Sequence, residues 1–232
     1  MEKLVYCVWQ ERGAPIEPLR ERLFADSAPE LLARSRGPVT LHVADVPGGF
    51  TTDRSGPALG AVASVWLDSV DQRLPIEESL RKLSRSVTGY LVTESVPLEY
   101  ARRDWPDGAR SPGITVMAMF EKPAWLEGDE FIRRWHESHT PKSLEIHPLR
   151  RYVRNVVARV LTPGARPFAG IVPEAFETLE DFTDPRRLYG GAHEKYGGFE
   201  ATLRVMLEDQ KSFLDLANVH VTIVSETLLR SS

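Results

Sequence analysis

His139 is the residue whose position best suits chemistry. It follows Phe131 and Trp135 at intervals of four residues, so an α-helix places all three side chains on one apolar face, and charged residues occupy the opposite arc. A neutral imidazole with an ordinary pKa suits proton abstraction next to a carbonyl group, or protonation of a leaving hydroxyl. The alternative is a structural histidine that binds a free backbone carbonyl near the end of the helix.

Tyr152 lies on the strand that the sequence predicts after this helix. Its phenol would donate a hydrogen bond to a developing enolate or phenolate oxygen; the alternative is a half-buried strand tyrosine. Arg150 and Arg154 alternate with Tyr152 on the same face of the strand. Either all three side chains point into the interior of the predicted barrel, or Tyr152 alone reaches inward. An inward Arg154 would bind an anionic substrate, and a salt bridge to a glutamate is the alternative.

The helix of His139 carries two more candidates for substrate binding, Trp135 and His136. His136 and His139 form a His-x-x-His pair, which could in principle hold a metal ion. Two histidines need a third ligand, however, and no spacing downstream supplies one. No metal site is therefore predicted.

The segment Thr183–Gly198 contains two glycine pairs together with Tyr189 and His193. This composition is typical of a hinged loop. We expect either a lid, in which Tyr189 and His193 bind substrate, or an exposed excursion without ligand contacts. No Lys-Ser or Lys-Thr follows the glycines, so a phosphate-binding motif is not predicted and no cofactor is expected.

Composition restricts the class of protein. The 232 residues carry a net charge of −4 with scattered basic residues, whereas nucleic-acid binding needs a concentrated positive face. Cys7 is the only cysteine, which favours a reducing compartment. The sequence has no secretory signal and no run of about 18 apolar residues. We expect a cytoplasmic protein with a small-molecule substrate, no nucleic-acid or membrane partner, and a homodimer as one possible assembly.

An internal repeat organises the chain. A shift of 110 residues joins three anchors: Gly37-Pro38-Val39 with His147-Pro148-Leu149, Gly60 with Gly170, and Trp66 with Phe176. The same shift places His42 over Tyr152. Upstream, a shift of 112 places Ser27-Ala28-Pro29 over His139-Thr140-Pro141. Towards the ends of the copies the shift is 132, with Tyr90 over Thr222, so the second copy is about 22 residues longer. Because Ser27 replaces His139, the cleft of the first copy should be chemically poor.

Apolar periodicity predicts the same order of elements, β-α-β-β-α-β, in both copies. The expected strands are Leu4–Trp9, Val39–Val46, Ala61–Leu67, Gly89–Val96, Ile114–Phe120, Leu149–Leu161, Phe168–Phe176 and Val219–Ser225. The expected helices include the segment around Phe131–His139, Glu77–Leu83 and Phe199–Leu216. The fold class is α+β, with two tandem ferredoxin-like units (1–100 and 113–232) joined by a linker at 101–112. Each unit leaves one sheet face uncovered, so we expect the units to pair as a pseudo-twofold α/β barrel.

The second copy resembles the EthD family of dimeric α/β-barrel proteins. The resemblance rests on five stretches: Met119-Phe120-Glu121-Lys122-Pro123, Asp129-Glu130-Phe131, Trp135, His139-Thr140-Pro141 and Leu149-Arg150-Arg151-Tyr152-Val153. The chain departs from the family at Glu127, where a Ser often opens the helix, and in its longer loop before the last helix. The resemblance covers about half of the chain. It implies the barrel fold and chemistry without a bound cofactor.

Three functions are compatible with these features. The first is a cofactor-free lyase, isomerase or cyclase acting on a small carbonyl-containing or phenolic ring compound, with His139 as general acid/base and Tyr152 as hydrogen-bond donor. The second is a non-catalytic ligand-binding or accessory protein of a degradative or biosynthetic pathway, which uses the barrel as an apolar container. The third is a cofactor-free or haem-linked monooxygenase on the same barrel.

Overall fold

Eight antiparallel strands form a closed barrel in a computed structural model that describes residues 1–52, 56–191 and 193–231, without the side chain of His193. The strands are β1 (Glu2–Gln10), β2 (Val39–Val43), β3 (Ala58–Leu67), β4 (Ser86–Leu98), β5 (Ile114–Glu121), β6 (Arg151–Val160), β7 (Phe168–Phe176) and β8 (His220–Arg230). Around the barrel they follow the order β1-β3-β2-β8-β5-β7-β6-β4. Each half of the chain thus supplies four adjacent strands, and the halves meet along the β2–β8 and β4–β6 seams. The predicted pairing of two ferredoxin-like units within one chain is confirmed.

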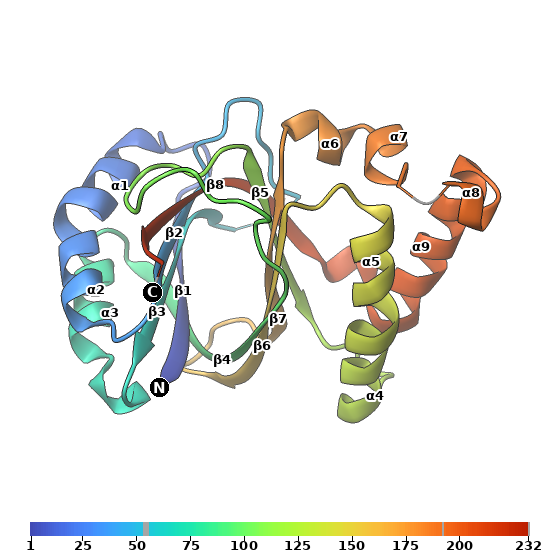
Figure 1. Ribbon diagram of the computed structural model, residues 1–232. Helices are drawn as coiled ribbons and strands as arrows, with labels where there is room; N and C mark the ends of the chain where they lie inside the picture. The colour runs from blue at the N-terminus through green and yellow to red at the C-terminus, as the bar shows by residue number, and fades with distance from the viewer. Residues whose placement is uncertain (53–55, 192, 232) are drawn as a thin grey trace.

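Helices cover the outer faces of the two half-barrels (Figure 1). On the first half these are α1 (Glu17–Arg22), α2 (Ala28–Arg34) and α3 (Leu74–Arg81); on the second they are α4 (Gly128–Arg133), α5 (Thr140–Ile146) and α9 (Phe199–Phe213). The extra residues of the second half form α6 (Leu179–Thr183), α7 (Pro185–Leu188) and α8 (His193–Tyr196), where the sequence had predicted a loop. Separate apolar clusters fill the helix-to-sheet layers and the barrel interior.

The cross-strand registers correct the predicted 110-residue shift. Val62 lies opposite Cys7 in the first half, and Ile171 lies opposite Met119 in the second. Since Cys7 and Met119 are equivalent at the 112-residue shift, Val62 corresponds to Ile171 and the true shift of this strand is 109. Gly60 with Gly170, and Trp66 with Phe176, are therefore not matched pairs.

The second strands of the two halves, β2 and β6, also depart from the predicted 110-residue alignment. His42 lies opposite Val62, and Asn155 lies opposite Ile171, so His42 corresponds to Asn155 rather than to Tyr152. Both of these side chains belong to the barrel-facing side of their strands. A shift by an odd number of residues moves a strand side chain to the other face, and Tyr152 accordingly faces the helices.

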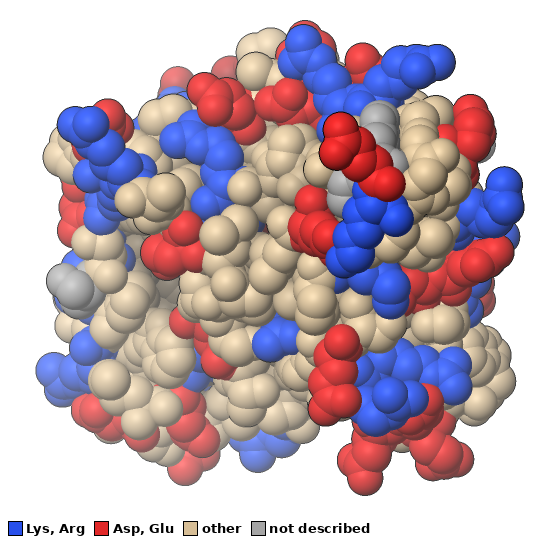
Figure 2. Space-filling model, turned by 45° about the vertical axis from the view of Figure 1, so that its right-hand side comes forward, with Lys and Arg blue, Asp and Glu red and all other residues tan. Residues whose placement is uncertain are grey.

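The linker predicted at 101–112 runs along β8. The backbone N–H of Gly108 donates to the carbonyl of Leu228, and that of Ser111 donates to the carbonyl of Glu226. Figure 2 shows basic and acidic side chains interspersed over the face that it presents. In the part of the chain that the structure describes, no helix is both long and apolar enough to span a bilayer.

Candidate functional site

A cavity of about 220 Å³ lies between the outer face of the second-half sheet and the helices that cover it. Trp135, Phe120, Phe213 and other apolar residues form much of its wall. The groups with hydrogen-bonding capacity around it include His139, Ser143, His147, Tyr152, Glu174 and Tyr189. The cavity is thus outside the barrel interior, which corrects the expectation that Tyr152 points into the barrel.

A break in the helix positions His139. The segment Arg134–His139 is π-helical, and α5 begins directly after it with Pro141 in its first turn. Proline has no N–H to continue the i→i−4 pattern, so one extra residue is accommodated at this point. The N–H and the hydroxyl of Thr140 both donate to the carbonyl of Trp135 (hydroxyl to carbonyl 2.9 Å), which satisfies a carbonyl at the break. The break leaves the His139 ring between α5 and α9.

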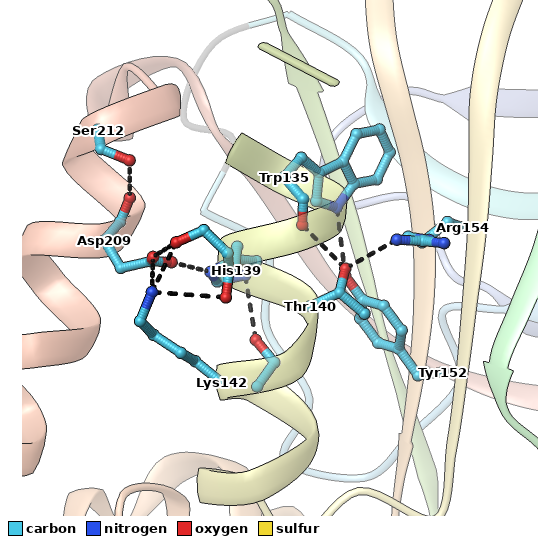
Figure 3. A network of polar contacts seen from close by, with 10 residues as sticks. Trp135, His139, Thr140, Lys142, Tyr152, Arg154, Asp209 and Ser212 are labelled. Carbon is cyan, nitrogen blue, oxygen red and sulfur yellow. Dashed lines mark hydrogen bonds and ion pairs between the residues drawn. The ribbon is translucent and has the colours of Figure 1, made fainter. Parts of the chain in front are cut away.

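His139 is held through both ring nitrogens (Figure 3). Its Nδ1 lies 2.8 Å from Oδ2 of Asp209 on α9, and its Nε2 lies 3.1 Å from the hydroxyl of Ser143 on α5. Ser138 and Lys142 donate to Oδ1 of the same carboxylate at 2.6 and 2.5 Å. Burial acts to raise the pKa of Asp209, but hydrogen bonds from His139, Lys142 and Ser138 outweigh it and bring that pKa to about 2. Asp209 is therefore ionised, and the Nδ1 of His139 carries a proton that it donates to this carboxylate.

This arrangement is different from the structural histidine considered above, whose ring would bind a backbone carbonyl. A histidine bound by a carboxylate has a fixed tautomer and orientation, with the Nε2 lone pair directed at the opposite side. Here Nε2 points to the Ser143 hydroxyl, which itself borders the cavity. His139 can thus exchange a proton with a bound molecule directly or through Ser143.

Tyr152 and Glu174 lie on neighbouring strands and face each other across the β6–β7 pair. The Tyr152 hydroxyl accepts a hydrogen bond from Trp135 Nε1 at 3.3 Å, and burial raises the pKa of this phenol, so it stays protonated. Glu174 has no hydrogen-bond or ion-pair partner among the described residues. Burial alone raises the pKa of Glu174 to about 8. The site therefore contains a carboxyl group that is largely protonated at neutral pH.

Sequence reasoning missed Glu174, although a signal was present. Its strand is apolar, and alternation places Glu174 between Val172 and Phe176 on the face turned towards the helices. A single acid in the middle of such a face is unusual because burying an unpaired charge is costly. Recognising it required the correct face of the strand, which the 110-residue register did not provide.

His147 and Tyr189 close the cavity on the side of the longer insertion. His147 Nδ1 lies 2.7 Å from the carbonyl of Leu188, and the His147 and Tyr189 ring centres are 5.3 Å apart. Burial lowers the pKa of His147 to about 4, so its ring is neutral and Nδ1 donates to this carbonyl. The insertion thus contributes Tyr189 to the cavity wall, and His147 is a wall residue too.

The structure does not bring all the predicted site residues together. Trp135, His139, Tyr152 and Tyr189 line the cavity, whereas His136 and Arg154 do not. Arg154 donates to Thr140 Oγ1 at 3.1 Å and to Ser95 Oγ at 3.0 Å, so it links β4 and β6 to the helix break (Figure 3 shows the first of these bonds). The side chain of His193 lies outside the described residues. Among the residues that are described, no group of three or more His, Cys, Asp or Glu is placed to hold a metal ion.

The closed barrel built from two ferredoxin-like halves places this chain in the structural class of the dimeric α/β-barrel proteins. No family model matches the chain, and neither does any curated protein. Solved structures do match. An anthrone oxidase-like protein has a TM-score of 0.60 and 11% identity, over 98% of this chain and 93% of that one. A proposed monooxygenase from Lactobacillus acidophilus NCFM has a TM-score of 0.51 and 9% identity, over 98% and 94%. At such low identities the likeness concerns the fold alone.

Proposed function

We propose that this protein is an enzyme that moves protons on a small carbonyl-containing or phenolic ring compound, as a lyase, isomerase or cyclase. The observation that supports the proposal is the meeting of His139, Tyr152 and Glu174 around one cavity with aromatic walls. A cavity of about 220 Å³ has room for a small ring compound. The resemblance of the second copy to the EthD family is consistent with this assignment and is part of the same proposal.

Each polar group has a role that follows from its environment. The imidazole of His139, oriented by Asp209, accepts a proton from a carbon next to the substrate carbonyl, either at Nε2 or through the Ser143 hydroxyl. The hydroxyl of Tyr152 donates a hydrogen bond to the oxygen on which negative charge develops. Glu174, protonated at neutral pH, delivers a proton to that oxygen, to a second carbon or to a leaving hydroxyl. The receiving atom decides between isomerisation and loss of water.

An oxidase or monooxygenase activity is the second candidate. Two proteins with the same fold are described as anthrone oxidase-like and as a proposed monooxygenase. Removal of a proton from an activated ring carbon is a reasonable first step for an oxidation without a bound cofactor, and the groups named above would perform it. The two candidates therefore share a first step and differ in what the carbanion meets next, a proton or molecular oxygen.

The test is a proton-exchange experiment with a panel of small aryl ketones and phenols in deuterated water. If the proposal is correct, at least one compound that binds will exchange its activated hydrogen, as followed by NMR, and His139→Asn and Glu174→Gln will each slow that exchange. An oxygen electrode in the same samples distinguishes oxidation from isomerisation. Binding without exchange or oxygen uptake would mean that the protein is a non-catalytic ligand-binding or accessory protein.

A further inference from the structure

A second cavity, of about 340 Å³, lies at one end of the barrel interior. Its wall includes barrel-facing residues of β1, β2, β3, β4 and β6, whereas the candidate site lies outside the barrel. Further along the same interior the walls are apolar, with Val5, Cys7, Met117 and Met119 in one buried cluster. The barrel interior thus changes from apolar to polar at this end.

One wall of this cavity carries hydrogen-bonding groups without partners. His42 is only 2% exposed, and among the described residues neither of its ring nitrogens has a hydrogen bond, although Nε2 lies 3.5 Å from a carboxylate oxygen of Glu226. Thr40 and Ser64 lie opposite each other on β2 and β3, and their hydroxyls likewise form no hydrogen bond within the described part of the chain. Buried polar groups normally have partners, so this wall is suited to a ligand that both donates and accepts.

The charged residues that line the opposite side of the cavity are all engaged in ion pairs. Lys3 forms an ion pair with Glu94, and Arg151 donates to Glu226 at 3.0 Å. The other oxygen of Glu226 accepts hydrogen bonds from Tyr100 at 2.9 Å and from Ser111 at 2.8 Å. Arg151 also pairs with Glu99 at 2.8 Å, and Arg103 pairs with Asp107, so each charged residue of the wall has a partner of opposite charge. A ligand with a net charge would leave an unbalanced charge in a mostly buried site, which is unfavourable.

Stability does not account for this polar layer. Buried ion pairs are often no more stable than well-packed apolar residues of similar volume, and an unpartnered imidazole adds a further cost. Trp66 lies on β3 two residues from Ser64 and opposite Lys3, so its ring stands at the edge of the same cavity, with Tyr100 as a second aromatic wall. Neutral hydrogen-bonding groups beside aromatic faces fit a ring that has apolar faces and polar edges.

We propose that this end of the barrel interior is a second ligand site, which binds a small neutral molecule with several hydroxyl groups, such as a sugar or cyclitol ring. Its hydroxyls would bind Thr40, His42 and Ser64, and its apolar face would lie against Trp66. The proposal is independent of the proton-transfer function assigned to the outer cavity.

The test is ligand-observed NMR and calorimetry of the full chain with glucose, myo-inositol, benzoate and phenylethylamine as probes. We expect glucose or myo-inositol to bind and the two charged probes not to compete with it. Ser64→Ala should weaken polyol binding roughly 3- to 10-fold, the effect of losing one hydrogen bond, and Trp66→Leu by a similar factor or more. His139→Asn, in the outer cavity, should leave polyol binding unchanged.

Three results would overturn the proposal. In the first, the folded protein binds neither polyol. In the second, a charged probe displaces the bound polyol. In the third, Ser64→Ala leaves polyol binding unchanged whereas His139→Asn weakens it. Ser64→Ala is the preferred variant because it removes a single oxygen and leaves the ion pairs intact. The thermal unfolding midpoint of each variant shows that the protein compared is folded.

Discussion

The two halves of the barrel have the same helix-to-sheet layer, but among the described residues the candidate site lies in the layer of the second half. Five positions of this layer can be matched through the helix and strand registers. In the second half they are Trp135, His139, Ser143, Tyr152 and Glu174, all bordering the cavity; in the first half they are Leu23, Ser27, Leu31, Val39 and Val65, each with 0% exposure. The first half thus uses this layer for packing, and the second half places polar groups there.

The difference shows how little of the repeated unit has to change to create a site. Both halves have a π-helical segment just before a proline, Leu23–Ser27 in one and Arg134–His139 in the other. At the end of this segment the first half has a side-chain hydrogen bond, in which the Ser79 hydroxyl donates to Ser27 Oγ at 3.1 Å. The second half forms the His139–Asp209 pair at the same place. The shared break in the helix is therefore a property of the fold, and the last residue of the π-helical segment decides the chemistry.

The largest effect on stability should come from truncating the aromatic anchor of the second half. Trp135→Ala removes a side chain that is 1% exposed and packed against Phe120 and Phe131, so it should lower the free energy of unfolding by about 3–5 kcal/mol. Leu23→Ala is the matched change in the first half and should cost about 2–5 kcal/mol. Urea unfolding measures both. A cost below about 1 kcal/mol for Trp135→Ala would contradict the packing described for the second half.

His139→Asn should have the largest effect on activity. The amide of Asn can still donate to Asp209, but it has no titratable nitrogen, so turnover should fall by about 10²-fold or more while stability changes little. Steady-state kinetics and unfolding curves of the same preparation separate the two effects. If the variant instead unfolds readily and its folded fraction keeps full activity, His139 is a structural residue. The polar groups of the second half then do not form a catalytic site around it.

Glu174→Gln should change the pH dependence of stability. Because the pKa of Glu174 is raised to about 8 in the folded protein, the folded state binds a proton more tightly than the unfolded state between about pH 4.5 and pH 8. Its contribution to stability is therefore lost as the pH rises through this window, with a slope of at most about 1.4 kcal/mol per pH unit. The lowered pKa values of Asp209 and His147 have the opposite sign, and the His147 window, between about pH 4 and pH 6.5, overlaps that of Glu174. Both groups are present in wild type and variant, so the difference between the two proteins isolates Glu174.

The measurement is the free energy of unfolding in urea, compared between wild type and Glu174→Gln at pH 6, 7 and 8. The wild type should lose stability relative to the variant with each step. Val65 occupies the matched position in the first half, so no equivalent slope arises there. If the free energy of unfolding changes with pH in the same way in both proteins, Glu174 is ionised and solvated in the folded state. It could then not act as a proton donor at neutral pH.

The smallest effect should come from Ser27→Ala in the first half. The change removes the acceptor of the Ser79 hydroxyl and should lower the free energy of unfolding by about 1 kcal/mol. Activity should stay within about twofold of wild type, because Ser27 is fully buried in the first-half layer and borders no part of the candidate site. A loss of activity similar to that of His139→Asn would mean that the two halves are coupled, and the comparison between them would fail.

Much of the fold was predictable because it depends on local patterns. The period-2 and period-3.6 patterns predicted eight strands close to their observed bounds, and β7 was predicted at Phe168–Phe176, where it is found. The repeat predicted that two units would close one barrel, which the strand order confirms. His139 was predicted from its helix face, its place near the helix end and the His-x-Pro resemblance, and the residues four and eight positions before it are indeed buried aromatics.

The sequence by itself thus determined the elements, their order and the inward face of the His139 helix. Only the tertiary structure decided which face of each strand meets which neighbours, since a register error of an odd number of residues exchanges the two faces of a strand. That error paired His42 with Tyr152, which in fact lie on opposite faces, and it hid Glu174. The partner of His139 could not be predicted from the sequence either, because Asp209 is 70 residues away and the two meet only when α5 and α9 pack together on the sheet. The raised pKa of Glu174 has the same origin, since burial is a property of the assembled fold.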